Sequence, residues 1–167
     1  MAVLSWGKPK IFIKDLDAET PVWTLMPESA EDSTTLETTK GEKVEAKLEG
    51  GENQDVRYKR NTYALATSIR IAKGTTQPIA ASDGLVTHNY AICVQPEDTS
   101  CVGFVIKKAE VSVEETWTAA DGGTWVYTFD ALKPASGNQV EWGTVVATAG
   151  SGSSADTYTI TVGGTAV

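Results

Sequence analysis

Apolar and polar residues alternate with a period of two over much of this chain, which is the pattern of half-buried β-strands. The strongest run extends from Phe104 to Phe129. Its first half alternates two sets of side chains, one of them Val105, Lys107, Ala109, Val111 and Val113 and the other Ile106, Lys108, Glu110, Ser112 and Glu114. After the glycine-containing turn 120–123, Trp125 shares a face with Tyr127 and Phe129. We therefore predict a hairpin over 104–134 with one aromatic side, which builds the body of the fold.

The same alternation predicts further strands near 11–13, 44–48, 63–71, 86–94, 140–146 and 158–162. A helical period of 3.6 is absent from every window of a dozen residues. Only Glu28–Leu36, with Ser29 or Ser33 as N-cap, and Pro78–Ser82 are candidate helices, and we expect one short helix. The prediction is an all-β fold, mainly β with one short helix. It consists of two packed antiparallel sheets, arranged as a sandwich or a partly closed barrel.

The chain of 167 residues is expected to form one domain, 1–167, because this length is sufficient for one buried core and short for two. Two segments interrupt the regular pattern. Thr24–Lys43 is polar and acidic and lacks the apolar spacing of a core element, so we predict an extended loop that projects from the body as an arm. The Ser- and Gly-rich segment 148–156 is predicted to be flexible.

The net charge of −8 is unevenly distributed. Between Asp15 and Asp55 there are twelve acidic residues and three lysines, a balance of −9, whereas the rest of the chain has ten acids and eleven bases. Surfaces that bind nucleic acids concentrate positive charge, so specific binding of nucleic acid is not expected. The acidic stretch is interpreted as a solvated loop or as a surface that repels DNA.

The first residues lead into Lys8-Pro9-Lys10 without the apolar region of a signal peptide, and no apolar run is long enough to span a membrane. We therefore expect a protein made and used in the cytoplasm. In that reducing environment the thiols of Cys93 and Cys101 are expected to be free. Their spacing is not that of a zinc site, and the chain has a single histidine.

Specific catalytic and metal-binding signatures are missing from the sequence, including the P-loop, G-x-S-x-G, H-E-x-x-H and EF-hand patterns. His88 has no nucleophile motif beside it and is interpreted as a residue at a strand end. The pairs Glu97/Asp98 and Glu114/Glu115 are interpreted as solvated. Neighbouring residues in a strand point to opposite faces, so Glu114 and Glu115 would not act together as an acid and a base. We expect no catalytic, cofactor-binding or metal-binding residues, and no enzymatic activity.

The chain contains a series of turn and strand residues in a distinctive order. They are Gly7-Lys8-Pro9-Lys10-Ile11, Lys40-Gly41-Glu42-Lys43, Asp83-Gly84, Asn89-Tyr90-Ala91, Gln95-Pro96-Glu97-Asp98, Gly103-Phe104, Val111–Glu115, Ala120-Asp121-Gly122-Gly123 and Tyr127–Pro134. In order and spacing this series resembles the tail tube (major tail) proteins of long-tailed bacteriophages, especially those in prophages of gut Bacteroidales. The resemblance covers most of the chain and contains no catalytic signature.

This resemblance implies a structural virion protein that assembles into stacked hexameric rings. One sheet of each subunit would join its neighbours around an acidic lumen through which DNA passes, and rings would stack through a long loop and the chain termini. Segment 24–43 matches the position of that stacking loop. Segment 148–156 departs from the family pattern, as either a long hairpin loop or a terminal arm. The expected partners are further copies of the chain and other tail proteins, with no membrane.

Three tryptophans support an alternative function, a carbohydrate- or surface-binding β-sandwich. Trp117, Trp125 and Trp142 would then form an exposed stacking platform. A core position is favoured, because Trp125 is in phase with Tyr127 and Phe129. A second alternative is a carboxylate-based hydrolase, which would need two acids converging in a cleft. A third is another tail component of related fold, such as a tail terminator or baseplate hub protein.

Overall fold

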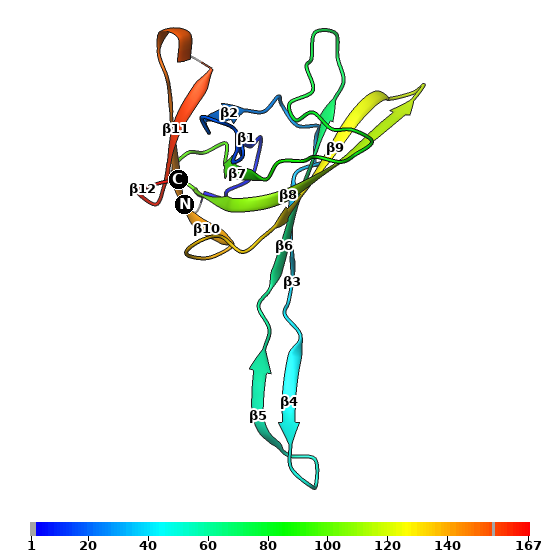
Figure 1. Ribbon diagram of the computed structural model, residues 1–167, viewed down its shortest axis with the longest axis vertical. Coiled ribbons are helices and arrows are strands. Elements are labelled where there is room, and N and C mark those ends of the chain that lie inside the picture. Colours follow the sequence, from blue (N-terminus) through cyan, green and yellow to red (C-terminus); the bar gives the residue numbers. More distant parts are fainter. Residues whose placement is uncertain (1–2, 155) are drawn as a thin grey trace.

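The computed structural model describes residues 3–154 and 156–167 and has twelve strands there (Figure 1). In chain order the strands are β1 Lys10–Asp15, β2 Trp23–Leu25, β3 Thr35–Thr39, β4 Lys43–Lys47, β5 Asn53–Tyr58, β6 Thr62–Arg70, β7 Tyr90–Gln95, β8 Val102–Thr118, β9 Gly122–Ala131, β10 Val140–Ala149, β11 Thr157–Val162 and β12 Thr165–Ala166. The prediction of an all-β fold is confirmed. No helix in the described ranges is long and apolar enough to cross a membrane.

Ten of the strands form one large antiparallel sheet, and β4 and β5 form a separate two-stranded sheet. Part of the large sheet closes on itself, because β8 pairs with both β7 and β10, and the path from β10 returns to β7 through β11, β2 and β1. The other part is open and runs from β8 through β9 and β6 to β3. The long strand β8 belongs to both parts, so the two layers of the fold are two regions of one continuous sheet.

Two apolar cores follow from this arrangement. The main core lies between the closed part and the open part, and includes Ile11, Ile92 and Ile106 from the former and Leu65, Tyr127 and Phe129 from the latter. A second core fills the closed part with Phe12, Trp23, Ala91, Cys93, Val105, Val145, Ile160 and Val162. Phe12 lies between Ile11 and Ile13 in β1 but belongs to the other core, as the alternation of strand side chains requires.

The predicted hairpin of β8 and β9 is confirmed, but strict alternation along β8 is wrong. Tyr90 pairs with Ala109 while Ile92 pairs with Ile106, so β8 contains one more residue than β7 between these two pairs. This bulge at Lys107 and Lys108 shifts the phase of the alternation. Because of it Val105 faces the second core whereas Ala109 faces the main core. Without the bulge, the second half of β8 would turn its apolar face away from the main core.

Neither predicted helix is present in the part of the chain that the structure describes, where the only helical element is a 3-10 turn at Gly152–Ser154. The serines expected to cap a helix at Glu28–Leu36 form other hydrogen bonds. Ser29 Oγ lies 2.8 Å from Thr67 Oγ1, and Ser33 Oγ donates to the Ala30 carbonyl at 2.7 Å. The Ser29–Thr67 contact, together with a hydrogen bond from Ser33 Oγ to the Ser68 carbonyl at 3.4 Å, holds the segment against β6 as a loop that leads into β3.

The candidate helix Pro78–Ser82 is instead part of an irregular loop. The backbone N–H of Ile79 donates to the Tyr127 hydroxyl at 3.5 Å, and that hydroxyl donates to the Ile79 carbonyl at 3.3 Å. Both backbone groups of Ile79 therefore bind a side chain of β9. They do not form the bonds between successive turns that a helix requires.

The long projection of the molecule is a hairpin formed by β4 and β5 (Figure 1). We call residues 40–61 the arm. The predicted extended loop Thr24–Lys43 overlaps the arm only at residues 40–43, because its earlier part contains the end of β2, the loop packed on β6, and β3. The second interrupted segment, 148–156, connects β10 to β11. Ala149 pairs with Tyr158, which corresponds to the hairpin-loop alternative; Ala155 lies outside the described residues.

Candidate assembly surfaces

The arm exposes apolar side chains on both of its faces. Val44 and Leu48 lie on one face with exposed fractions of 50% and 49%, and Val56 and Tyr58 lie on the other with 37% and 56%. An isolated two-stranded hairpin is at best marginally stable in water, because neither face is covered by a further layer. The arm therefore has the composition of a candidate contact surface.

Local sequence explains why the arm forms a hairpin. Gly50 and Gly51 have φ angles of 99° and 89°, which residues with a Cβ rarely adopt. They connect the alternating run that begins at Val44 to β5, with Leu48 N–H donating to Glu52 O at 2.8 Å. Strand β5 was not predicted from the sequence. The two adjacent glycines between alternating residues were the signal that would have revealed it.

The charges of the arm nearly cancel. Residues 40–61 contain six bases and five acids, and several of them pair within the arm. Lys59 Nζ lies 2.5 Å from Glu42 Oε2, and Arg57 Nε lies 2.9 Å from Asp55 Oδ2. Lys43 forms an ion pair with Glu45. Such exposed pairs contribute little stability. They do leave the arm without the strong net charge that would repel an identical copy.

The acidic excess belongs to the body of the molecule. Residues 15–37 contain seven acids and no lysine or arginine. They span the end of β1, β2, the loop packed on β6 and the start of β3. The acidic surface expected from the sequence therefore lies mainly N-terminal to the arm.

A close backbone contact joins the two sides of the arm at its base. The Gly41 N–H donates to Asn61 Oδ1 at 3.0 Å, and a Cβ on Gly41 would lie 1.8 Å from the Lys59 carbonyl oxygen. On the body side the arm continues as β3 and β6, of which β3 is the outer strand of the open part. The outer edge of β3 has unpaired backbone groups, which makes it a surface suited to strand pairing.

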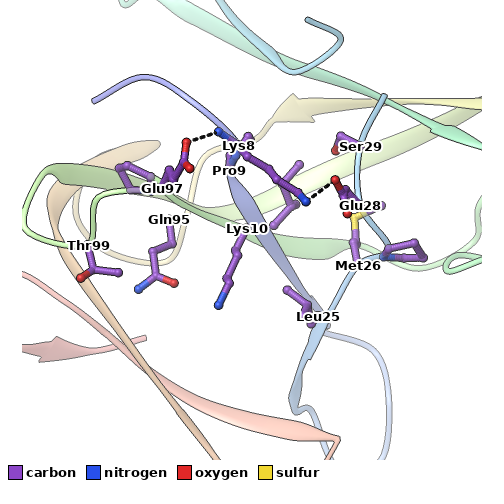
Figure 2. Close-up of a pocket in the computed structure, with 13 residues that line it drawn as sticks. Lys8, Pro9, Lys10, Leu25, Met26, Glu28, Ser29, Gln95, Glu97 and Thr99 are labelled. Carbon is purple, nitrogen blue, oxygen red and sulfur yellow. Dashed lines mark hydrogen bonds and ion pairs between the residues drawn. The ribbon is translucent and has the colours of Figure 1, made fainter. Parts of the chain in front are cut away.

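Two grooves border the N-terminal segment and the loop that precedes β3. One, of ≈ 380 Å³, lies between β1, β2 and the end of β7 (Figure 2). Lys8 lies at its rim, where its backbone N–H donates to Glu97 Oε2 at 3.0 Å and its ammonium pairs with Glu28. The larger groove, of ≈ 690 Å³, has Leu65, Val94 and Phe104 in its wall and Glu31 and Asp32 in its acidic rim.

Neither groove contains a recognisable arrangement for catalysis. The two acids of the smaller groove both bind Lys8: Glu97 accepts a hydrogen bond from its backbone N–H, and Glu28 forms an ion pair with its ammonium. Asp98 accepts hydrogen bonds from the backbone and hydroxyl of Ser100 at 2.9 and 2.6 Å, so it stabilises its own turn. No group of three or more His, Cys, Asp or Glu residues suited to a metal occurs among the described residues.

The three tryptophans of the carbohydrate-binding alternative do not form one platform. Trp117 is 74% exposed near the tip of the β8–β9 hairpin, and Trp142 is 60% exposed with its ring centroid 4.9 Å from that of Phe104. Phe104 is thirteen residues from Trp117 along β8, a separation of about 40 Å in an extended strand. Trp125 is partly buried against the main core. The expected core position therefore holds for Trp125 and is wrong for the other two.

The two thiols are free, and their environments differ. Cys93 is fully buried in the second core, and this burial raises its pKa to about 12. Cys101 is partly exposed in the loop before β8, where its Sγ lies 3.9 Å from the Val3 carbonyl oxygen. Burial thus keeps the Cys93 thiol protonated, whereas a nucleophilic cysteine needs the thiolate.

His88 has a partner that the sequence did not indicate. Its Nδ1 lies 2.8 Å from Asp15 Oδ2, although the two residues are 73 positions apart. Glu114 and Glu115 are both exposed in β8. These residues bring no nucleophile, base and oxyanion-stabilising group together.

No protein-family model matches the chain, and no curated protein matches it. The assignment of a function therefore rests on the geometry described above and on the resemblance noted from the sequence.

Proposed function

We propose that this chain is a structural protein that assembles with copies of itself into stacked hexameric rings, and that these rings form the tail tube of a long-tailed bacteriophage. The observation that carries the proposal is the arm, a two-stranded hairpin with half-exposed apolar side chains on both faces. A hairpin of this kind is stabilised when another protein surface covers it. Contact with a neighbouring copy supplies such a surface by symmetry.

Two further features support assembly in rings. The outer strand β3 leaves an edge to which a neighbouring sheet can add, so a ring removes an exposed edge from every copy. The seven acids of residues 15–37 give the body a surface that repels a phosphate backbone. In the proposed tube this surface contributes to a lumen through which DNA passes without specific binding. The protein would then reside in the virion tail after synthesis in the host cytoplasm, with no enzymatic role.

Electron microscopy of the concentrated full-length chain tests the proposal. Hollow tubes or six-fold rings are expected, and analytical ultracentrifugation should show large species that increase with protein concentration. A chain that stays monomeric at high concentration and binds glycans on an array would overturn the proposal in favour of the carbohydrate-binding alternative.

A further inference from the structure

The loop between β6 and β7, residues 71–89, covers one side of the main core. Ile79 is buried within that core, and Ala81 and Val86 pack against it. We call this segment the cover loop. Its polar contacts with the sheet are the Tyr127 hydroxyl, which binds the backbone of Ile79, and a short bridge to β8, in which the Val113 N–H donates to the Gly84 carbonyl at 3.3 Å. Water can replace each of these hydrogen bonds, so each one contributes only modestly to keeping the loop closed.

The C-terminal end of the cover loop is held by the turn that follows β1. His88 Nδ1 lies 2.8 Å from Asp15 Oδ2, and the Asn89 N–H donates to Asp17 Oδ2 at 2.8 Å. The Leu16 N–H donates to the Asn89 carbonyl at 3.0 Å. Two carboxylates, one at the end of β1 and one in the turn after it, therefore bind the last two residues of the cover loop.

We propose that the Asp15–His88 pair is a pH-sensitive latch, which holds the cover loop on the main core while His88 is protonated and loosens it when His88 loses its proton. The groups that face His88 are Asp15, the last residue of β1, and Asp17 from the turn after it. Tyr90, at the start of β7, donates to Asp15 Oδ2 at 3.5 Å. The chain has one histidine, so the latch contains its only imidazole.

The charges around the latch define the pH range over which it acts. The hydrogen bond to Asp15 and the nearby carboxylate charges raise the pKa of His88 above its ordinary value of 6.5. Burial favours the neutral form of Asp15, but hydrogen bonds from His88 and the Asp17 backbone outweigh it and lower the pKa of Asp15 below 3.8. The pair thus stabilises the closed loop fully between pH 3.8 and pH 6.5, the ordinary pKa values of Asp15 and His88. Its contribution is lost as the pH rises through the folded pKa of His88, and also as it falls through that of Asp15.

Hydrogen exchange of the full-length chain at about pH 5.5 and about pH 8 tests the latch, with each rate divided by the intrinsic rate at the same pH. The amides of Ile79 and Asn89 should be protected about two- to fivefold more at the lower pH, which is the range for a partly exposed ion pair. Amides of β9 serve as the internal control and should show no such difference. Equal protection of the cover loop at both pH values would overturn the proposal.

A matched variant separates the latch from other titrations. His88→Gln keeps a polar side chain but cannot be protonated, so its cover loop should show the high-pH protection of the parent at both pH values. A pH dependence that persists in this variant would assign the effect to another group and refute the latch. A second measurement is the proton NMR titration of the single histidine. It should give a pKa above 6.5 in the parent and a lower value in Asp15→Asn, and equal values in the two proteins would also refute the latch.

Discussion

The arm provides the sharpest test of the proposed self-assembly. We consider a variant in which its four half-exposed apolar side chains are replaced by threonine, namely Val44→Thr, Leu48→Thr, Val56→Thr and Tyr58→Thr. Threonine keeps the preference of these positions for strand structure, so the hairpin should persist. None of the four side chains belongs to either core of the body. The variant should therefore unfold at the same temperature as the parent, within a few degrees.

The expected loss of assembly follows from the exposed fractions. Complete burial of one such side chain contributes a free energy of about 1.5–3 kcal/mol. Because each of the four side chains is about half exposed in the single chain, burying the rest on assembly would contribute ~1 kcal/mol per side chain. Four positions give ~4 kcal/mol per arm, which is about a thousandfold in an association constant. The entropic cost of association is common to the parent and the variant, so this difference should appear directly in the concentration needed for assembly.

Sedimentation of a concentration series measures the onset of assembly, and electron microscopy identifies the species. The four-threonine variant should require about a thousandfold more protein than the parent, or form no large species in the accessible range. Asn53→Thr/Gln54→Thr is the matched control, because it changes two polar residues of β5 and no apolar contact. If the four-threonine variant is folded and assembles at the concentration of the parent, the arm is not the contact surface and this reasoning fails.

Two further predictions concern the body of the molecule. Gly103→Ala should lower the free energy of unfolding in urea by about 1–3 kcal/mol, because its Cβ would lie 2.3 Å from the Val94 carbonyl oxygen in the β7–β8 pairing. The control Thr144→Ala, an exposed change in the neighbouring strand, should have little effect. Equal stability of the two variants would contradict the crowding argument. A thiol reagent at mildly alkaline pH should modify Cys101 in the native chain and reach Cys93 only after unfolding, since burial raises the pKa of Cys93 to about 12. Mass spectrometry of the labelled peptides measures the modification of each cysteine. Rapid labelling of both thiols in the native chain would contradict the prediction.

The sequence was most informative where the structure is determined locally. The β8–β9 hairpin is formed by residues adjacent in the chain, and its glycine turn and the shared face of Tyr127 and Phe129 can be read directly from the residues. Trp125 follows the same alternation and packs beside them. Local alternation and turn chemistry are sufficient for such a hairpin, because each pairing lies within a short stretch of chain.

Other features depend on partners that are distant in the sequence. The loop at 26–34 contains cap-forming serines, but its hydrogen bonds to Thr67 and to the backbone of β6 replace a helix. The bulge in β8 is visible only from the register of β7. The Asp15–His88 contact joins the end of β1 to a loop 73 residues away. Composition and periodicity carry no information about such contacts, because they depend on which surfaces the completed sheet brings together.

The distribution of charge and apolar surface between the arm and the body bears on the geometry of the proposed self-assembly. A hairpin that docked with one face on a flat surface would need apolar side chains on that face alone. Here Val44 and Leu48 point to one side and Val56 and Tyr58 to the other, so complete burial requires protein on both sides of the arm. The near-neutral charge of residues 40–61 permits this insertion, whereas the uncompensated acids of residues 15–37 would oppose it. The physical chemistry therefore favours an assembly in which each arm is enclosed by neighbouring copies and the acidic part of the body stays hydrated.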